Sequence, residues 1–184
     1  MILNERDCRH EHILHVGKQI MTAARTAPKG KGVDIIETAL IDGKEIKLLS
    51  ETMTAMVKEH GLKFFLRDAD NILNAECIVL IGTHEEHQGL NCGYCGYASC
   101  NDRIEGVPCA INAIDVGIAI GSACATAADF RVDTRVMFSA GLAAQRLNWL
   151  QGCKLVIAIP ISASSKILSL IVNQRIINSQ TITL

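Results

Sequence analysis

The sequence predicts an α+β or α/β sandwich of three layers, in which helices cover both faces of one sheet. Segments with helical spacing alternate with short β-branched or apolar segments along the chain. The 184 residues suffice for one sizeable core and are short for two. With 49% hydrophobic and 20% charged residues, the composition is that of a folded chain rather than a disordered one. We therefore expect a single domain over residues 1–184.

The first half of the chain contains five predicted elements. Apolar residues at helical spacing indicate two helices, and β-branched or continuous apolar runs indicate three strands. In chain order the elements are a helix over 10–25, a strand over 32–41, a helix over 44–60, a short strand over 63–69 and an interior strand over 76–82. Gly61 is expected to end the second helix, because glycine readily adopts the left-handed conformation found there.

The second half opens with an irregular segment over 83–108, which has neither helical nor strand periodicity. After it the pattern predicts a helix buried on most sides over 109–128, an amphipathic helix over 133–149, an interior strand over 153–161 and a polar arm or frayed end over 173–184. Asp133 or Thr134 is expected to cap the second of these helices.

Charge and hydropathy argue against several kinds of partner. A formal net charge of -1 does not indicate a nucleic-acid binder. Charged residues stand where a secretory signal would need an apolar core, so we expect a cytoplasmic, reducing setting. Residues 110–128 are apolar and nearly long enough to span a membrane, but Asp115 and many small residues favour a helix packed inside the protein. The carboxylate of Asp115 needs a partner there, and we expect a helix N-terminus, Arg131 or Arg135 to provide it.

The eight cysteines fall into distinct groups. Three lie inside apolar runs, where we expect small buried hydrophobic residues: Cys77, Cys124 and Cys153. Four others fall within 18 residues of the irregular segment, with the spacing Cys92-x2-Cys95-x4-Cys100-x8-Cys109. That segment has too few apolar side chains to form a core of its own, and long irregular segments inside a domain usually have a function or an organising centre. We expect the four thiols to provide that centre.

Four cysteine thiolates are the ligand set of a [4Fe-4S] cluster. The x2 spacing lets two thiolates bind neighbouring corners of one centre, and the intervening glycines let the backbone fold tightly around sulfide. Pro108 precedes the last cysteine, whereas in a ferredoxin run proline follows it, so the spacing is not the standard ferredoxin one. The sequence nevertheless predicts a [4Fe-4S] cluster with four ligands: Cys92, Cys95, Cys100 and Cys109.

Structural zinc is the alternative at these cysteines. Zinc sites usually use two close pairs separated by a longer loop, and only the first pair here has that spacing. His84 and His87 lie just upstream and could join Cys92 and Cys95 in a mixed site. With four cysteines present, such histidines are more often solvated loop residues.

Residues 25–32, "RTAPKGKG", combine three positive charges with two glycines. Such a segment can form a flexible cationic loop whose amides approach a phosphate, and a solvated turn after a helix is the equal alternative. The sequence contains no G-x-G-x-x-G or Walker pattern, so neither a Rossmann dinucleotide site nor a P-loop is supported.

The run "NCGYCGYASC", followed by "PCAINAIDVGIAIGSACATAADFRVDTRVMFSAG", resembles a family of uncharacterised prokaryotic proteins described as containing a ferredoxin domain. The similarity extends from residue 23 to residue 162. This resemblance implies a cluster-binding loop, over residues 83–109, inserted into a larger body. The last twenty residues depart from the pattern of that family.

Two further segments resemble nitroreductase-like flavoproteins: "AARTAPKGKGVD", from residue 23, and "IDVGIAIGSACATAA", which is similar to their long central helix. The resemblance implies a homodimeric α+β sandwich with a mixed sheet and bound FMN. It places three cations near an FMN phosphate or isoalloxazine edge: Arg25, Lys29 and Lys31. The Pro-Ser-x-x-Asn pattern of those proteins is absent because Lys29 follows Pro28, and Arg6 and Arg9 are the candidates for their N-terminal phosphate motif.

These observations favour an iron-sulfur redox protein with one [4Fe-4S] cluster, which in one version is an FMN-dependent oxidoreductase acting on an unknown small substrate or redox partner. A zinc-stabilised binding or assembly module without redox activity is the alternative from a different class. An iron-sulfur carrier or sensor is the third hypothesis.

Overall fold

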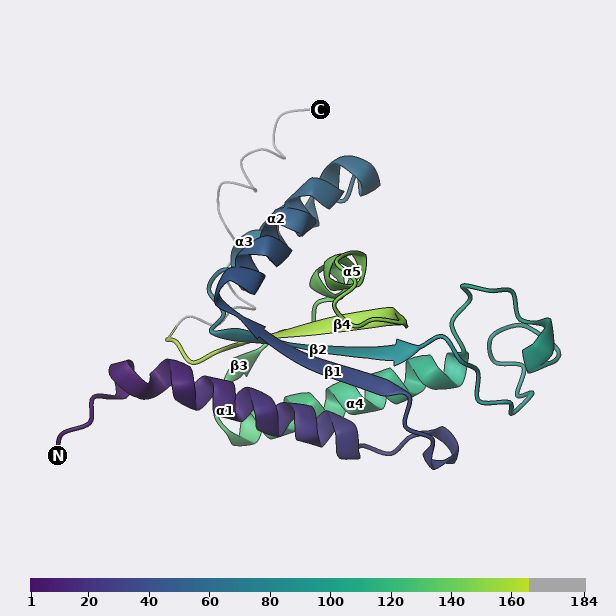
Figure 1. The fold of residues 1–184 in the computed structure, drawn as a ribbon, viewed down its shortest axis with the longest axis horizontal. Coiled ribbons are helices and arrows are strands. Elements are labelled where there is room, and N and C mark those ends of the chain that lie inside the picture. Colours follow the sequence, from purple (N-terminus) through teal and green to yellow (C-terminus); the bar gives the residue numbers. More distant parts are fainter. Residues whose placement is uncertain (166–184) are drawn as a thin grey trace, which may run out of the picture.

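The computed structural model describes residues 1–165 and shows one sheet between two layers of helices (Figure 1). Its strands are β1 (Ile36–Asp42), β2 (Cys77–His84), β3 (Asp133–Thr134) and β4 (Cys153–Ser162), and they lie in the order β1-β2-β4-β3. The predicted α+β sandwich is confirmed. Within the described residues every strand pair is antiparallel, so the mixed pairing implied by the flavoprotein resemblance does not occur there. The predicted arm over 173–184 lies outside these residues.

The two strands predicted to be interior, β2 and β4, form the centre of the sheet. Successive side chains of a strand point to opposite faces, so β2 supplies both cores. Ile78 and Leu80 are buried in one core, whereas Val79 and Ile81 are buried in the other. A continuous apolar run is therefore the pattern that this position in the sheet requires.

On one face of the sheet, α1 (Glu5–Thr26) packs beside α4 (Ala110–Asp129) (Figure 1). The Asn4 side chain accepts a hydrogen bond from the backbone N–H of Arg6 at 3.1 Å and caps α1. The helix therefore begins at Glu5, earlier than the start predicted from the apolar spacing.

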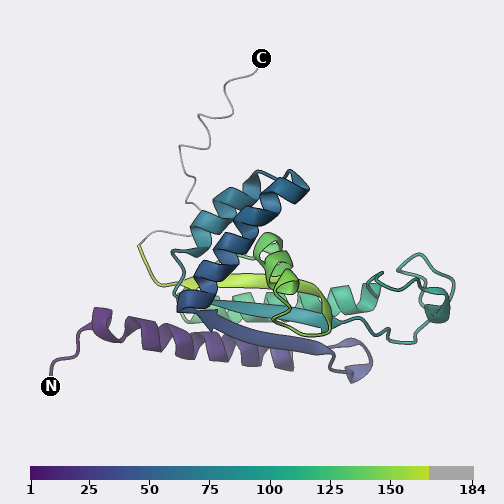
Figure 2. The ribbon, with the colours of Figure 1, turned by 45° about the horizontal axis from the view of Figure 1, so that its top comes forward.

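On the other face lie α2 (Gly43–His60), α3 (Phe64–Ile72) and α5 (Phe138–Arg146), as Figure 2 shows. Gly61 follows α2 with a φ of 67°, so the predicted end of that helix is confirmed. This layer and the sheet enclose the second core.

The predicted short strand over 63–69 is wrong, because residues 64–69 belong to α3 and Lys63 is its N-cap. Phe65, Ala69 and Ile72 are buried at helical spacing against α2 and the sheet. Asp68 is also buried and accepts a hydrogen bond from the Ser139 hydroxyl on α5 at 2.7 Å. A short apolar run does not distinguish a strand from a helix by itself. Because Asp68 is charged, the sequence pattern also does not show that its position belongs to the buried face of a helix.

The helix predicted over 133–149 is shorter, because its first residues enter the sheet. Asp133 and Thr134 form β3, paired with Ser162 and Ile161 of β4, and α5 begins only at Phe138. Neither residue caps the helix, so that prediction is also wrong. Pairing with a strand far along the chain outweighs the local preference of Asp and Thr for helix caps.

Among the described helices, α4 is the one long and apolar enough to cross a membrane, a test that a core helix also passes. Its inner face, including Val116 and Ala119, is buried in the core shared with α1. Its outer face is open, since the side chains of Ile114 and Ile118 are 48% and 41% exposed. The prediction of a helix buried on most sides is therefore wrong, because α4 is buried on one face only.

Candidate functional site

The four clustered cysteines lie on one segment, residues 85–109, which we call the cysteine loop. It leaves the sheet at the end of β2, projects beyond it and returns at the start of α4 (Figure 1). Its only regular element is the single turn η2 (Cys100–Asp102). The loop therefore connects a central strand of the sheet to a long helix of the sandwich.

Arg103 and Glu85 close the cysteine loop at its base. The Arg103 guanidinium donates hydrogen bonds to the carbonyl oxygen of Glu85 at 2.8 Å and to that of Val107. The Glu85 carboxylate accepts from the N–H of Gly106 and lies 3.4 Å from the ammonium group of Lys154 on β4. The backbone N–H of Gly106, with the nearby Lys154 and Arg103, lowers the pKa of Glu85, although burial opposes the shift. These contacts join the two ends of the loop.

A buried pair of amides fixes the loop to α4. The Gln88 side chain is 6% exposed and donates to the Asn112 side chain at 3.1 Å. Asn112, which is 1% exposed, donates in turn to the carbonyl oxygen of Glu86. Buried amides that are paired in this way specify one arrangement of the backbone. The loop therefore enters the first turn of α4 in a defined position.

Cys109 is the residue immediately before α4 and is 6% exposed. Burial alone would raise the pKa of its thiol, but backbone N–H groups of Gln88, Asn112 and Ile111 and the charge of Arg103 together lower it. The N-terminus of a helix favours negative charge because its first N–H groups have no partner within the helix. The chain thus favours the thiolate at Cys109, the form that binds metals.

Two other buried cysteines behave in the opposite way. Burial raises the pKa of Cys77 to about 12 and that of Cys153 to about 11. Burial likewise raises the pKa of Cys124, which is partly buried. The prediction that these three act as small hydrophobic residues is confirmed for Cys77 and Cys153, whereas Cys124 is only half-buried.

The remaining three thiols lie on the projecting part of the loop, Cys92 exposed and Cys95 and Cys100 half-buried. The Cys100 sulfur accepts the backbone N–H of Asn91 at 3.3 Å, and the Asn91 side chain accepts the N–H of Cys100 at 2.8 Å. This reciprocal pair brings Cys100 beside the start of the cysteine motif. N–H groups directed at sulfur are a recurrent feature of iron-sulfur sites.

Glycines shape the backbone between the first two cysteines of the motif. Gly93 and Gly96 have φ values of 73° and 88°, which glycine adopts without strain. The N–H of Gly96 donates to the carbonyl oxygen of Gly93 at 2.9 Å and closes a turn around Cys95. The glycines were predicted to let the backbone fold tightly, and they form a tight turn at Gly93–Gly96.

Within residues 1–165, no three Cys, His, Asp or Glu side chains are gathered in a group ready to hold a metal ion. The four loop thiols are free, and the loop brings them to one end of the molecule without closing a coordination sphere. His84 lies 3.3 Å from the Glu37 carboxylate, and His87 accepts the N–H of Gly89 at 3.1 Å. Both histidines thus have partners other than the cysteines.

The donor set fits an iron-sulfur centre. Four thiols share one loop, the Asn91 N–H points at the Cys100 sulfur, and Cys109 lies at the N-terminal cap of α4. The buried Nε of Arg103 has no hydrogen-bond partner among the described residues. Thiolates, N–H groups around them and a nearby cation are what a negatively charged cluster needs.

The three cations predicted to meet FMN all have protein partners. Arg25 donates to Asp34 at 2.8 Å, and Lys29 turns back to the carbonyl oxygens of Ala24 and Ala27 at the end of α1, at 2.9 and 2.8 Å. Burial lowers the pKa of Lys29. These contacts, rather than solvation alone, order the cationic loop.

The cationic loop and the cysteine loop meet at the N-terminal end of α4. Lys31 donates to the carbonyl oxygen of Gln88 at 3.0 Å, and both carboxylate oxygens of Asp115 accept the N–H of Gly30 at 3.0 Å. Asp115 thus pairs with the backbone at the start of η1 (Gly30–Gly32), rather than with either arginine. A Cβ atom at Gly30 would lie 2.6 Å from the Ile111 side chain.

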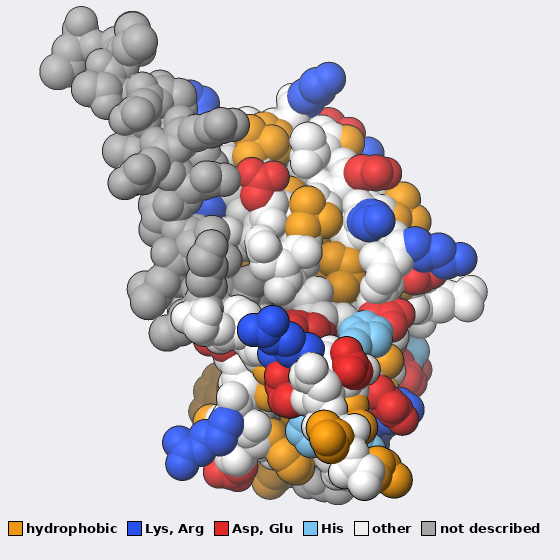
Figure 3. Space-filling model, turned by 90° about the vertical axis from the view of Figure 1, so that its left-hand side faces the viewer, with side chains coloured by type: hydrophobic (Ala, Val, Ile, Leu, Met, Phe, Trp, Pro, Cys, Tyr) orange, Lys and Arg blue, Asp and Glu red, His pale blue; other side chains and the backbone are white. Residues whose placement is uncertain are grey.

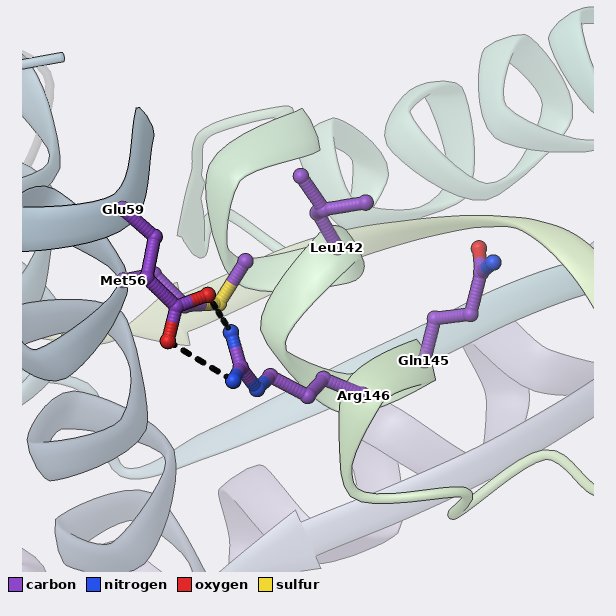
Figure 4. Close-up of a pocket in the computed structure, with 5 residues that line it drawn as sticks. All are labelled: Met56, Glu59, Leu142, Gln145 and Arg146. Atoms are coloured by element: carbon purple, nitrogen blue, oxygen red, sulfur yellow. Dashed lines mark hydrogen bonds and ion pairs between the residues drawn. The ribbon is translucent and has the colours of Figure 1, made fainter. Parts of the chain in front are cut away.

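The end opposite the cysteine loop carries interspersed acidic, basic and histidine side chains (Figure 3). A cavity of about 430 Å³ lies there, lined in part by His10, which is 3.3 Å from the Asp42 carboxylate. Another cavity of about 330 Å³ lies between α2 and α5, where Arg146 pairs with Glu59 over Met56 (Figure 4). Neither cavity is lined by a predicted site residue.

Comparison with known proteins identifies the group to which the chain belongs. Residues 105–168 match the family described as an uncharacterized protein containing a ferredoxin domain (DUF2148). An uncharacterized protein of Archaeoglobus fulgidus is 37% identical over 176 residues, which cover 90% of this chain and 95% of that protein. The chain belongs to this ferredoxin-domain family. The matched residues include Cys109 and begin after the other three cysteines of the loop.

Several solved structures have a fold similar to that of this ferredoxin-domain protein. A nitroreductase with bound FMN from Desulfitobacterium hafniense has a TM-score of 0.59 at 13% identity, covering 83% of this chain and 78% of that one. A BluB-like flavoprotein from Clostridium difficile has a TM-score of 0.54 at 15% identity, covering 86% and 88%. At such identities the similarity establishes a nitroreductase-like fold and no more.

Proposed function

We propose that this chain is an iron-sulfur redox protein that holds one [4Fe-4S] cluster on the cysteine loop, with four ligands: Cys92, Cys95, Cys100 and Cys109. The observation that carries the proposal is the environment of Cys109. Cys109 is buried at the N-terminal cap of α4, where backbone N–H groups lower its pKa, whereas the purely structural Cys77 lies among apolar side chains. The ferredoxin domain that names the family supports the same chemistry.

A bound cluster of this type accepts and releases single electrons. The chain supplies the surroundings for that chemistry. The first turn of α4 favours negative charge at Cys109, and the Asn91 N–H donates a hydrogen bond to the Cys100 sulfur. The exposed side of the loop at Cys92 leaves a face open to a redox partner.

Anaerobic purification followed by iron, zinc and acid-labile sulfide analysis tests the proposal. We expect a brown protein with about four irons and four sulfides per chain. A colourless protein with about one zinc per chain would refute it and favour the zinc-stabilised module. Rapid transfer of the cluster to an apo acceptor would favour the carrier or sensor hypothesis instead.

FMN is the second cofactor that we propose, and the similarity of fold to FMN-containing structures supports it. The side chains of Arg25, Lys29 and Lys31 already have protein partners, so they do not by themselves form a phosphate site, and we assign no chemical step to FMN. Flavin released on denaturation of the purified protein would support binding. A protein that takes up no added FMN would contradict it.

We also propose that two copies of the chain pair through the outer face of α4. Ile114 and Ile118 are exposed there, and a Cβ atom at Gly117 or Gly121 would meet nothing within 4 Å. An exposed apolar face of this kind suits a symmetric contact, in which each helix meets its own copy.

The variant Ile118→Asp tests the dimer. Because the side chain is 41% exposed, we expect the variant to fold normally and to elute as a monomer, while the wild type elutes at twice the chain mass of 19.9 kDa. Light scattering after size exclusion measures this. Leu48→Asp, an exposed apolar position on α2 at the other face of the sheet, is the matched control and should remain dimeric. A monomeric wild type would contradict the proposal.

A further inference from the structure

Arg103 occupies a position in the cysteine loop that loop closure does not fully explain. Its two terminal nitrogens donate to the carbonyl oxygens of Glu85 and Val107 and hold the guanidinium in place. Its third donor, Nε–H, is buried and has no partner among the described residues. The group is therefore held in place while its buried Nε–H makes no hydrogen bond.

A buried donor without an acceptor destabilises the fold, and a charged one does so more than a neutral one. Native structures rarely leave such a group unmatched, so an acceptor is expected beside Nε. The Arg103 guanidinium is bonded to the carbonyl oxygen of Val107, two residues before Cys109, so it lies on the same stretch of the loop as that proposed ligand. Sulfur in a cluster or a thiolate carries negative charge and accepts N–H hydrogen bonds.

We infer that Arg103 raises the reduction potential of the proposed cluster. It does so through its fixed positive charge and through an Nε–H hydrogen bond to sulfur. The inference rests on the function proposed above. The reduced cluster carries one more negative charge than the oxidised one, so a nearby cation stabilises the reduced form more. Partial burial keeps the charge of Arg103 from being screened by solvent.

A purely structural role makes a different prediction. If Arg103 served only to join the ends of the loop, its replacement would reduce cluster retention but would not change the potential of the clusters that remain. The reduction potential, measured on protein of known iron content, therefore separates the two roles.

The experiment compares the wild type with Arg103→Gln and Arg103→Lys in anaerobic redox titrations followed by electron paramagnetic resonance. Lys154→Gln is the matched control, because Lys154 also lies at the base of the loop, 3.4 Å from Glu85, but has a half-exposed side chain. Iron and sulfide are measured first in each sample. A wild type without iron refutes the proposed function, whereas the inference about Arg103 is decided by the potentials.

We expect Arg103→Gln to lower the equilibrium constant for reduction about tenfold, equal to about 59 mV for one electron, while Lys154→Gln changes it much less. Arg103→Lys keeps the charge and should fall between wild type and Arg103→Gln. An iron-loaded Arg103→Gln with the wild-type potential, or an equal shift in Lys154→Gln, overturns the inference. If Arg103→Gln retains no cluster, Arg103→Lys decides: a lowered potential supports the Nε–H hydrogen bond, and an unchanged one overturns it.

Discussion

Replacing Cys109 by alanine is expected to abolish the four-iron species. The substitution removes a proposed ligand that differs from the other three in being a buried thiol at the N-terminal cap of α4, with a lowered pKa. The other three proposed ligands lie on the projecting loop, so without Cys109 the proposed cluster loses its one ligand at the body of the protein. We expect anaerobically purified Cys109→Ala to fall from about four irons per chain to a small fraction of that.

Cys124→Ala is the matched control for this experiment. Cys124 lies on the same helix, is partly buried, and has a pKa that burial raises. That variant should keep its iron, its sulfide and its visible spectrum. Retention of four irons and four sulfides by Cys109→Ala would contradict the ligand assignment, while loss of iron from both variants would indicate damage to α4 rather than loss of a ligand.

Gly141→Ala is expected to have the largest effect on stability. Gly141 lies in α5 where the helix crosses β4, and a Cβ atom there would overlap the carbonyl oxygen of Val156 and lie 2.6 Å from its carbonyl carbon. The obstacle is backbone at the centre of the sheet, which cannot rotate away as a side chain could. We expect a loss of about 3 kcal/mol or more in the free energy of unfolding.

Urea unfolding measures this difference, and Gln145→Ala is the control on the same helix. The Gln145 side chain is only half-buried and lines the cavity between α2 and α5, so we expect a change within about 0.5 kcal/mol. A Gly141→Ala variant as stable as the wild type would contradict this prediction. It would show that α5 can move away from β4 to make room for the Cβ atom.

The sequence determined the elements whose pattern is local. The spacing of Ile13, Val16 and Ile20 predicts α1 because helix periodicity places them on one face, and all three are buried. The continuous apolar run of β2 predicts an interior strand, and Gly61 predicts the end of α2. The cysteine loop could also be predicted, because its four thiols are closely spaced in a segment without helical or strand periodicity. Their gathering around a metal stays a prediction.

Only the tertiary structure decided the contacts between distant segments. Residues 64–69 form a helix because α2, α5 and the sheet surround Phe65 and satisfy the buried Asp68, whereas an isolated apolar run favours strand and helix alike. Asp133 and Thr134 become a strand because β4 offers unpaired backbone groups beside them.

The candidate site shows the same division. Cysteine spacing could be read from the chain, but the acceptor of the Lys29 ammonium, the partner of Asp115 and the amide pair of Gln88 and Asn112 could not. Hydrogen bonding of a polar side chain depends on which donors and acceptors the fold brings within about 3 Å. The sequence thus determined which thiols the loop carries, and the fold decided which groups lie beside the sulfurs of Cys100 and Cys109.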